Sequence, residues 1–250
     1  MDKEQLKAVL SEITPPAIWR WAMRTHYALK VELQNPPPSP ALPPALTEVW
    51  PEDPNVLYSD SRLLAMLETW GAGNAWHEIG FLIAGHKGKV LDIACGSGQA
   101  ILALNSIPAV EVYGCDLSSL FLEAAKKRGI LSERLTQCDA TLLPFDDNSF
   151  ELSYSLGSLE HFSEPNIERF LEEARRVSSL ASYHLIPISK DGRDHGFVHE
   201  IQYFFKNSVD WWLPRFEAHF PKVIVLPSLY DSPGYTAKWF LCFTEKGKSC

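Results

Sequence analysis

A short glycine turn is the first place in the sequence where residue types and spacing suggest chemistry. An apolar run beginning at Val90 leads through Asp92 into Cys95-Gly96-Ser97-Gly98, and a helical pattern follows from Gln99. Glycines in such a turn let the backbone approach a ligand closely, and the free amides at a helix start favour a polar or negatively charged group. The next apolar run ends at Asp116, where a carboxylate is suited to accepting both hydroxyl protons of a ribose. Together the turn and this acid predict a nucleoside cofactor.

The spacing of small residues disfavours a nicotinamide dinucleotide. That fingerprint needs small residues at positions i, i+2 and i+5. Counting from Gly96 through Gly98 places Ile101 where the third small residue belongs.

Three segments in the same order resemble the class I S-adenosylmethionine (SAM) dependent methyltransferases, in particular the group with the small-molecule type 11 methyltransferase domain. They are Val90 to Gly98, the strand ending at Asp116, and Cys138-Asp139-Ala140 with the following Leu143 to Phe150. The resemblance is close over about residues 88–180. It implies SAM as cofactor and a doubly wound, Rossmann-like α/β sheet of seven strands in the order 3-2-1-4-5-7-6, with the last-but-one spatial strand antiparallel.

The same resemblance implies a role for individual residues. Asp92 and the glycine turn would lie against the methionine moiety, Asp116 would bind the ribose, and Asp139 would hydrogen-bond the adenine amine. Leu117 would pack against adenine, and Ser155 would end the fourth strand near the sulfonium. The residues expected to contact SAM are Asp92, Ala94, Cys95, Gly96, Gly98, Asp116, Leu117, Asp139, Ala140 and Ser155.

Three histidines are candidates for a catalytic base, because an oxygen acceptor must lose a proton and histidine titrates near neutral pH. His161 comes first, since the segment Ser155 to Phe162 resembles the family's acceptor-facing loop; packing or capping of that loop is the alternative. His195 and His199 follow the fifth strand, where they are equally open to interpretation as solvated loop residues. Their spacing suits a metal only in a helix, which Gly192 and Gly196 disfavour, so we expect no metal.

The elements that must position these residues alternate along the chain. Strands are expected at Val90–Ala94, Val110–Cys115, Phe150–Ser155, Tyr183–Ile188, Val223–Leu226 and Trp239–Phe243, with helices between the first four. Such alternation indicates a mostly parallel, covered sheet. The turn-rich Asp231 to Gly234 joins the last two strands, which should therefore pair antiparallel. The family's usual lysine-proline-glycine-glycine turn is absent, and Val177 to Ser182 stands in its place.

The N-terminal part has a different character. Residues 1–34 show helical spacing, and Asn35 to Pro54 carries eight prolines, which favour extended backbone. We expect residues 1–58 to form a helical and proline-rich lid or arm over the cofactor cleft, and residues 59–250 to form the SAM-binding domain. Aromatic residues of this arm and of the segment from Tyr203 to Phe216 could line an acceptor pocket, although core packing is the commoner role.

Composition restricts the partners. A formal net charge of −8 over 250 residues argues against a surface that neutralises nucleic-acid phosphates. Five cysteines without a C-x-x-C pair favour a reducing, cytoplasmic compartment, and no apolar run is long enough to span a membrane. The three cysteines Cys95, Cys115 and Cys138 should fill small spaces near the cofactor.

The expected function is SAM-dependent methylation of a small molecule, with oxygen slightly favoured over nitrogen because of the available histidines. One alternative is a methyltransferase acting on protein or RNA. Another is a SAM-binding interaction module without catalysis. The sequence leaves the acceptor and the oligomeric state open.

Overall fold

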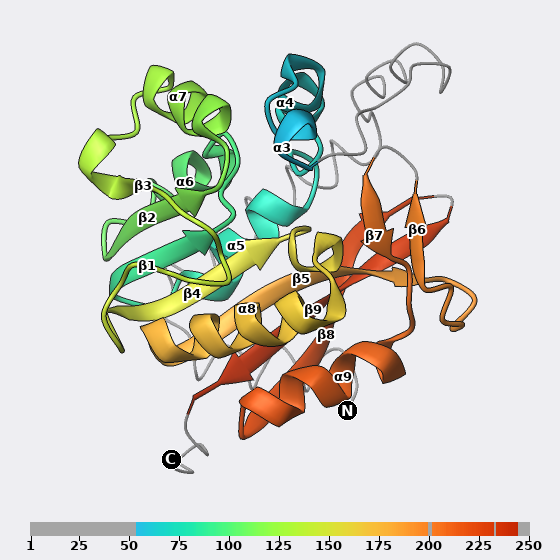
Figure 1. Ribbon diagram of the computed structural model, residues 1–250. Coiled ribbons are helices and arrows are strands. Elements are labelled where there is room, and N and C mark those ends of the chain that lie inside the picture. Colours follow the sequence, from blue (N-terminus) through green and yellow to red (C-terminus); the bar gives the residue numbers. More distant parts are fainter. Residues whose placement is uncertain (1–53, 200–201, 233, 245–250) are drawn as a thin grey trace, which may run out of the picture. The chain divides into compact units, whose positions relative to one another are not determined.

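The computed structural model describes residues 54–199, 202–232 and 234–244 (Figure 1). The chain divides into two units, Met1–Val49 and Trp50–Cys250, and the fold below belongs to the second. The expected N-terminal helices, nearly all of the proline-rich segment and residues 1–53 of the expected lid or arm lie outside the described residues. No helix within the described ranges is both long and apolar enough to cross a membrane.

A twisted sheet with a strand order of β3-β2-β1-β4-β5-β9-β8 organises the described residues. All neighbouring pairs from β3 to β5 are parallel, whereas β9 pairs antiparallel with both β5 and β8. This confirms the expected order, including the reversed strand next to the last. The strands are β1 (Gly88–Ile93), β2 (Val110–Asp116), β3 (Leu135–Gln137), β4 (Phe150–Leu156), β5 (Ser178–Ser189), β8 (Lys222–Asp231) and β9 (Tyr235–Phe243).

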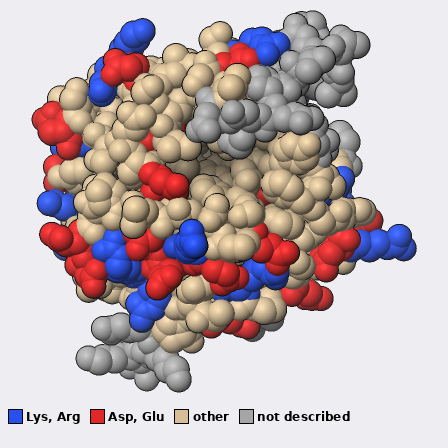
Figure 2. All heavy atoms as spheres, viewed as in Figure 1, with Lys and Arg blue, Asp and Glu red and all other residues tan. Residues whose placement is uncertain are grey.

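Helices cover both faces of this sheet. Those on one side contribute to a core with Val90 and Leu152, and include α5 (Ala75–Ile83), α6 (Gln99–Leu104) and α7 (Ser119–Lys127). On the other side, α8 (Glu164–Val177) and α9 (Val209–His219) pack over Leu91, Ile186 and Phe240; Figure 1 shows both in front of the sheet. Charged side chains of both signs form a band over α8, below a hollowed and mostly uncharged surface (Figure 2).

Shorter elements stand near the carboxyl ends of the parallel strands. They are α3 (Pro54–Leu57), α4 (Ser61–Leu67), the 3-10 turn η2 (Leu159–His161), and a hairpin of β6 (Phe197–His199) and β7 (Tyr203–Phe205). A second 3-10 turn, η1 (Ser132–Arg134), leads into the amino end of β3. Asp60 caps α4 by accepting a hydrogen bond from the Arg62 amide. Leu57, Leu63 and Phe121 form a small core that joins these elements to α7.

Three features of the strands differ from the sequence-based expectation. The short β3 (Leu135–Gln137) falls in none of the ranges expected to be strands. The fifth strand begins at Ser178, directly after α8, rather than at Tyr183. Its serines face those of β4: the Ser178 Oγ donates to Ser153 Oγ at 2.7 Å, and Ser153 Oγ lies 2.6 Å from Ser182 Oγ. The hairpin β6–β7 was not expected, because three-residue strands carry almost no periodic signal.

Candidate active site

The glycine turn has the backbone geometry that its sequence predicts. Gly96 and Gly98 have φ of 55° and 75°, and Ala94 also has a positive φ, 59°. Left-handed backbone is unfavourable for a residue with a Cβ atom, and such strain collects at functional sites. Gly98 caps α6 in this conformation, so the turn presents its amides at the start of a helix.

Asp116 ends β2 and holds this turn in place. Its Oδ2 accepts a hydrogen bond from the Gly96 amide at 2.8 Å, and its Oδ1 accepts one from the Ser118 amide at 2.8 Å. Each carboxylate oxygen retains a second lone pair, which can accept a ribose hydroxyl. Burial raises the pKa of Asp116 to about 6, although the amide hydrogen bonds from Ser118 and Gly96 oppose this shift.

Asp92 lies at the floor of the same site. Its side chain is 2% exposed at the end of β1. Burial raises its pKa well above the usual range, and the neighbouring Tyr154 hydroxyl works against the rise. A buried carboxyl of this kind is stabilised in its charged form by a cation, which the ammonium group of SAM would supply.

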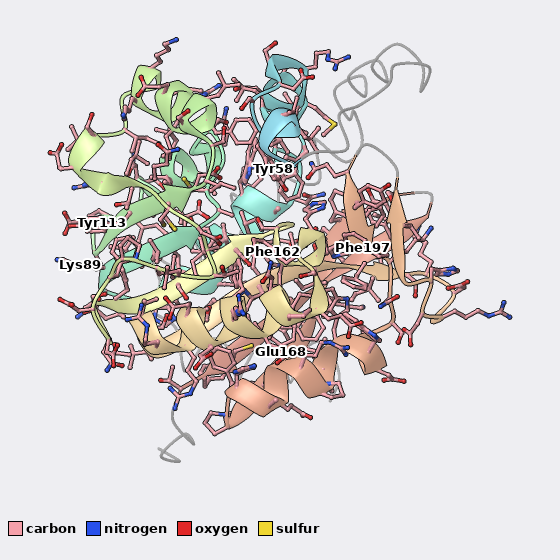
Figure 3. All side chains as sticks on the ribbon, in the orientation of Figure 1. Tyr58, Lys89, Tyr113, Phe162, Glu168 and Phe197 are labelled. Carbon is pink, nitrogen blue, oxygen red and sulfur yellow. The ribbon has the colours of Figure 1, made fainter. Side chains whose placement is uncertain are left out.

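A cavity of about 410 Å³ brings most of the expected cofactor residues together. Its size is typical of small-molecule sites. Tyr58 and Phe162 (Figure 3), which follow α3 and η2, also line it. Leu117 is 47% exposed there, so it offers an apolar surface to a flat ring. The expected residues in its wall are Asp92, Ala94, Cys95, Gly96, Asp116, Leu117, Asp139 and Ala140.

These residues fit the chemistry of SAM. Two carboxyl groups lie at the ends of adjacent strands, suited to an ammonium group and a ribose. At the third strand, Asp139 is exposed and its Oδ1 accepts hydrogen bonds from the Thr141 amide and hydroxyl, both at 2.8 Å. Cys95, Cys115 and Cys138 all line the cavity, as expected for small residues at strand ends.

Two expected contact residues do not line this cavity. Ser155 is fully buried on the opposite face of β4, where its Oγ lies 2.8 Å from His184 Nδ1. The two-residue period of a strand explains this difference, because Leu156 takes the cavity-facing position instead. Gly98 acts through its backbone: a Cβ there would collide with the Ile130 side chain, so glycine is needed for close packing.

A second cavity of about 220 Å³ adjoins the first. Leu67, Trp70, Gly157, His161 and Gln202 line both. Its remaining wall is mainly aromatic and aliphatic, and consists of Met66, Glu160, Leu185, Pro187, Phe204, Tyr230, Tyr235 and Ala237. We refer to the two as the cofactor cavity and the acceptor cavity.

His161 lies where the two cavities meet. Its Nδ1 is 2.7 Å from the Tyr203 carbonyl oxygen. A carbonyl only accepts hydrogen bonds, so Nδ1 carries the proton and the neutral ring keeps a lone pair on Nε2. Burial lowers the pKa of His161, and backbone contacts with Tyr203 and Gly157 oppose that shift. Burial therefore favours the neutral ring, which is the form that can accept a proton.

The other two candidate histidines are placed differently. His195 is exposed, its Nε2 lies 3.0 Å from Asp191 Oδ1, and it lines neither cavity. His199 ends β6, where it pairs with Tyr203. Of the described side chains, His161 is the histidine that the structure brings to the junction of the two cavities.

Glu78 fixes the aromatic wall of the acceptor cavity from outside. Its Oε2 accepts hydrogen bonds from Trp239 Nε1 at 2.6 Å and Ser228 Oγ at 2.7 Å, and its Oε1 accepts one from the Leu229 amide at 2.6 Å. Ser228 and Leu229 lie in the irregular part of β8 that leads to Tyr230, and Trp239 lies in the neighbouring β9. The α5 helix thus holds the segment that places Tyr230 in the cavity.

Several cavity residues could not be expected from the sequence. Trp70 lies in a turn before α5, whereas Tyr230 and Tyr235 lie at the facing ends of β8 and β9. The expected hairpin brings the two tyrosines together, but no spacing pattern connects them with Trp70 or marks them as cavity residues. Of the aromatic residues considered in advance, Phe204 and Tyr58 line cavities, whereas Trp212 and Phe216 are core beneath α9.

Comparison with known proteins agrees with this geometry. Residues 90–179 match the methyltransferase-domain family. The ubiquinone/menaquinone biosynthesis C-methyltransferase UbiE of Desulfotalea psychrophila is 41% identical over 93 residues, which are 36% of this chain and 38% of that relative. A demethylmenaquinone methyltransferase of Staphylococcus aureus is 29% identical over 162 residues, 59% of this chain and 67% of that relative.

A solved structure shows the same fold. The SAM-dependent methyltransferase of Aquifex aeolicus aligns with a TM-score of 0.53 at 18% identity, over 74% of this chain and 99% of that chain. The matched domain, the strand order with its reversed β9, and the carboxylates at the ends of β1 and β2 agree with one another. The matched domain, the relatives and the fold together support a class I SAM-dependent methyltransferase, whose cofactor is S-adenosylmethionine.

Proposed function

We propose that this protein transfers a methyl group from SAM to a small hydroxyaromatic acceptor. The observation that carries the proposal is the position of His161, which lines the cofactor cavity and the acceptor cavity together. A base at that junction can reach a hydroxyl group of an acceptor whose ring lies among Trp70, Phe204 and Tyr230. The small volume of the acceptor cavity, about 220 Å³, favours a small molecule over a protein or RNA segment.

The chain's own residues have three tasks in this reaction. Asp116 and the glycine turn hold the cofactor, and bound SAM supplies an activated methyl group on its sulfonium. The aromatic wall orients the acceptor and excludes water. His161 Nε2 accepts the hydroxyl proton of the acceptor while Nδ1 stays hydrogen-bonded to the Tyr203 carbonyl, so the base keeps its orientation as it becomes charged.

The choice between oxygen and carbon as methyl acceptor follows from the same proton transfer. A phenolate is nucleophilic at its oxygen and at the ring carbons ortho and para to it, so the histidine alone does not distinguish the two. The Desulfotalea relative is named a C-methyltransferase. We therefore favour a ring carbon as the acceptor atom over the oxygen that the histidines by themselves suggested. After transfer, the methylated ring carbon loses its hydrogen as a proton and the ring oxygen regains one, so the aromatic ring is restored and one proton is released overall.

The test has a binding part and a turnover part. Isothermal titration with SAM and with S-adenosylhomocysteine (SAH) should give micromolar affinity for at least one of them. The protein is then incubated with methyl-labelled SAM and a panel of monocyclic and bicyclic hydroxyaromatics, and products are detected by mass spectrometry. We expect a methylated product. Its added methyl group should resist the acid treatment that cleaves aryl methyl ethers. Acid-labile methyl would show oxygen as the acceptor atom.

Two results would contradict the proposal. Cofactor binding without product from any hydroxyaromatic, alongside turnover of amines, would replace the acceptor class. Cofactor binding without turnover of any small molecule, peptide or RNA would favour a SAM-binding interaction module.

A further inference from the structure

Glu160 is a buried carboxyl group that the proposed reaction does not use. It lies in η2, next to His161, with 3% of its surface exposed. It lines the acceptor cavity, and the wall of the cofactor cavity does not include it. Its Oε2 has no hydrogen-bond partner among the described residues, and its Oε1 lies 3.8 Å from His161 Nε2.

An unpartnered buried carboxyl group calls for an explanation, because most buried polar atoms are hydrogen-bonded. Leaving such a group without a partner costs about 1–3 kcal/mol or more. The described lining of the cavity contains no lysine or arginine, so nothing there compensates a negative charge. Burial accordingly raises the pKa of Glu160 to about 8, and at neutral pH the group is a carboxylic acid that can both donate and accept.

The surrounding rings suit a flat and uncharged ligand. Trp70 and Tyr230 have ring centroids 6.1 Å apart, Tyr230 and Tyr235 are stacked at 6.0 Å, and Phe204 lies 5.7 Å from Tyr235. Burial also lowers the pKa of His161, so the environment disfavours positive as well as negative charge. A cationic amine would need an ionised partner here, whereas a hydroxyl or carbonyl group needs only a hydrogen bond.

We propose that Glu160, as a neutral carboxylic acid, hydrogen-bonds to a second oxygen of the acceptor, so that the cavity selects aromatic molecules carrying a hydroxyl or carbonyl group in addition to the reacting hydroxyl. This inference rests on the proposed function. The consecutive residues Glu160 and His161 then act as two fixed polar points: His161 takes the proton from one oxygen, and Glu160 holds the other. Acceptors with a single oxygen leave the carboxyl group unpaired.

The inference is tested by equilibrium binding to the SAH-saturated protein, which needs no turnover. The ligands are phenol and its three dihydroxy counterparts, catechol, resorcinol and hydroquinone, with 4-hydroxybenzylamine as the amine probe. We expect at least one dihydroxy isomer to bind wild-type protein roughly tenfold or more tightly than phenol. The Glu160→Met variant, apolar and of similar length, should bind that isomer and phenol alike, and Glu160→Gln should keep a preference because its amide still hydrogen-bonds.

Affinity for SAH serves as the folding control, because Glu160 does not line the cofactor cavity. Should Glu160→Met fail to fold, difference infrared spectroscopy on wild-type protein replaces it: the preferred isomer should shift the protonated carboxyl band, phenol should not, and Glu160→Gln should lack the band.

The inference is overturned if wild-type protein prefers no dihydroxy isomer, if Glu160→Met keeps the preference, or if 4-hydroxybenzylamine binds more tightly than every dihydroxy isomer. Failure of the proposed function looks different. If binding depends on Glu160 but no methylated product forms, the proposed reaction is refuted and the Glu160 contact stands. If phenol is methylated as efficiently as every dihydroxy isomer, the Glu160 contact is refuted and the proposed reaction stands.

Discussion

At the scale of a single residue, Asp116 has two roles. It accepts the amides of Gly96 and Ser118, which shapes the turn, and it presents the same oxygens to the cofactor cavity. The sequence identified it by position alone, at the end of the second predicted strand. Its burial, and therefore its raised pKa, depends on residues such as Tyr58 that approach from outside the motif.

The raised pKa of Asp116 predicts weaker SAM binding in acid. In the ligand-free protein this carboxyl group is increasingly protonated below about pH 6, and a protonated carboxyl group is a poorer acceptor for two ribose hydroxyls. The raised pKa of Asp92 acts in the same direction. SAM affinity should therefore fall on going from pH 7 to pH 5, by up to about tenfold per unit for one group, and calorimetry in buffers of different ionisation enthalpy should detect proton release on binding.

Asp116→Asn provides the comparison for that experiment. The variant should bind SAM more weakly at pH 7 and show a shallower pH dependence, while Asp210→Asn, at an exposed position in α9, should behave as wild type. A flat affinity between pH 5 and pH 7 in wild-type protein would mean that both carboxylates remain ionised in the empty site.

His161 allows a sharper prediction about catalysis. Replacement by Asn keeps a donor near the Tyr203 carbonyl but removes the proton acceptor. The turnover number should fall by about 100-fold or more, with SAM affinity little changed, and activity should recover as the pH approaches the pKa of the acceptor hydroxyl. His195→Asn is the matched control, because His195 is exposed and lines neither cavity. Equal loss in both variants would remove His161 from the role of base.

Contacts between elements decide the shape of the acceptor cavity. The α5 helix reaches β8 and β9 through Glu78, whose carboxylate accepts three hydrogen bonds from those strands. Tyr230 follows immediately on the segment that Glu78 holds, and its amide is bonded to Ser228 Oγ at 3.0 Å. A residue on a helix outside the cavity thus controls an aromatic residue within it.

Glu78→Ala should lower both the free energy of unfolding and acceptor affinity. The loss of stability should be about 2 kcal/mol, since hydrogen bonds to a charged group are removed and the Trp239 Nε1 is left without this partner. Denaturant unfolding measures it, with Glu217→Ala, an exposed position in α9, as control. The Michaelis constant for the acceptor should rise while SAM affinity stays constant; a change in SAM affinity alone would show that Glu78 acts on the other cavity.

At the scale of the whole molecule, a buried histidine between two central strands links stability to pH. His184 is fully buried, its ring lies against Phe170 and Phe216, and its nitrogens contact Ser155 and Ser182. Burial lowers its pKa to about 3. The unfolded chain binds a proton at this site below about pH 6.5 and the folded chain does not, so stability is lost as the pH falls from 6.5 toward 3.

The contribution of His184 to the pH dependence of stability can be measured with the His184→Gln variant. Glutamine keeps a hydrogen-bond donor and an acceptor but does not titrate. Between pH 7 and pH 5, wild-type protein should lose about 2 kcal/mol more than the variant. The comparison is needed because Asp92, Asp116 and Glu160 act oppositely: their raised folded pKa values mean that the stability they cost shrinks as the pH falls. Parallel pH profiles for the two proteins would contradict a neutral buried His184.

The sequence by itself determined the alternation of strands and helices, and its resemblance to the class I SAM-dependent methyltransferases implied the strand order. The proposed cofactor residues depend on local patterns: apolar runs that end near Asp92 and at Asp116, and glycines that adopt left-handed backbone. Because parallel strands present their carboxyl ends at one edge, positions along the chain translated directly into positions in space. Ser155 was wrongly predicted to contact the cofactor. Successive side chains of a strand point to opposite faces of the sheet, so an error of one residue places the wrong side chain in the cavity.

Only the tertiary structure decided the acceptor half. Trp70, Phe204, Tyr230 and Tyr235 come from four separate segments and meet through strand pairing and the Glu78 contacts. Tertiary packing also separated His161, at the junction of the cavities, from the exposed His195. Glu160 has an unpaired oxygen and a raised pKa because it is buried. Burial depends on residues that are distant in the sequence and close in space, so a short stretch of sequence does not reveal it.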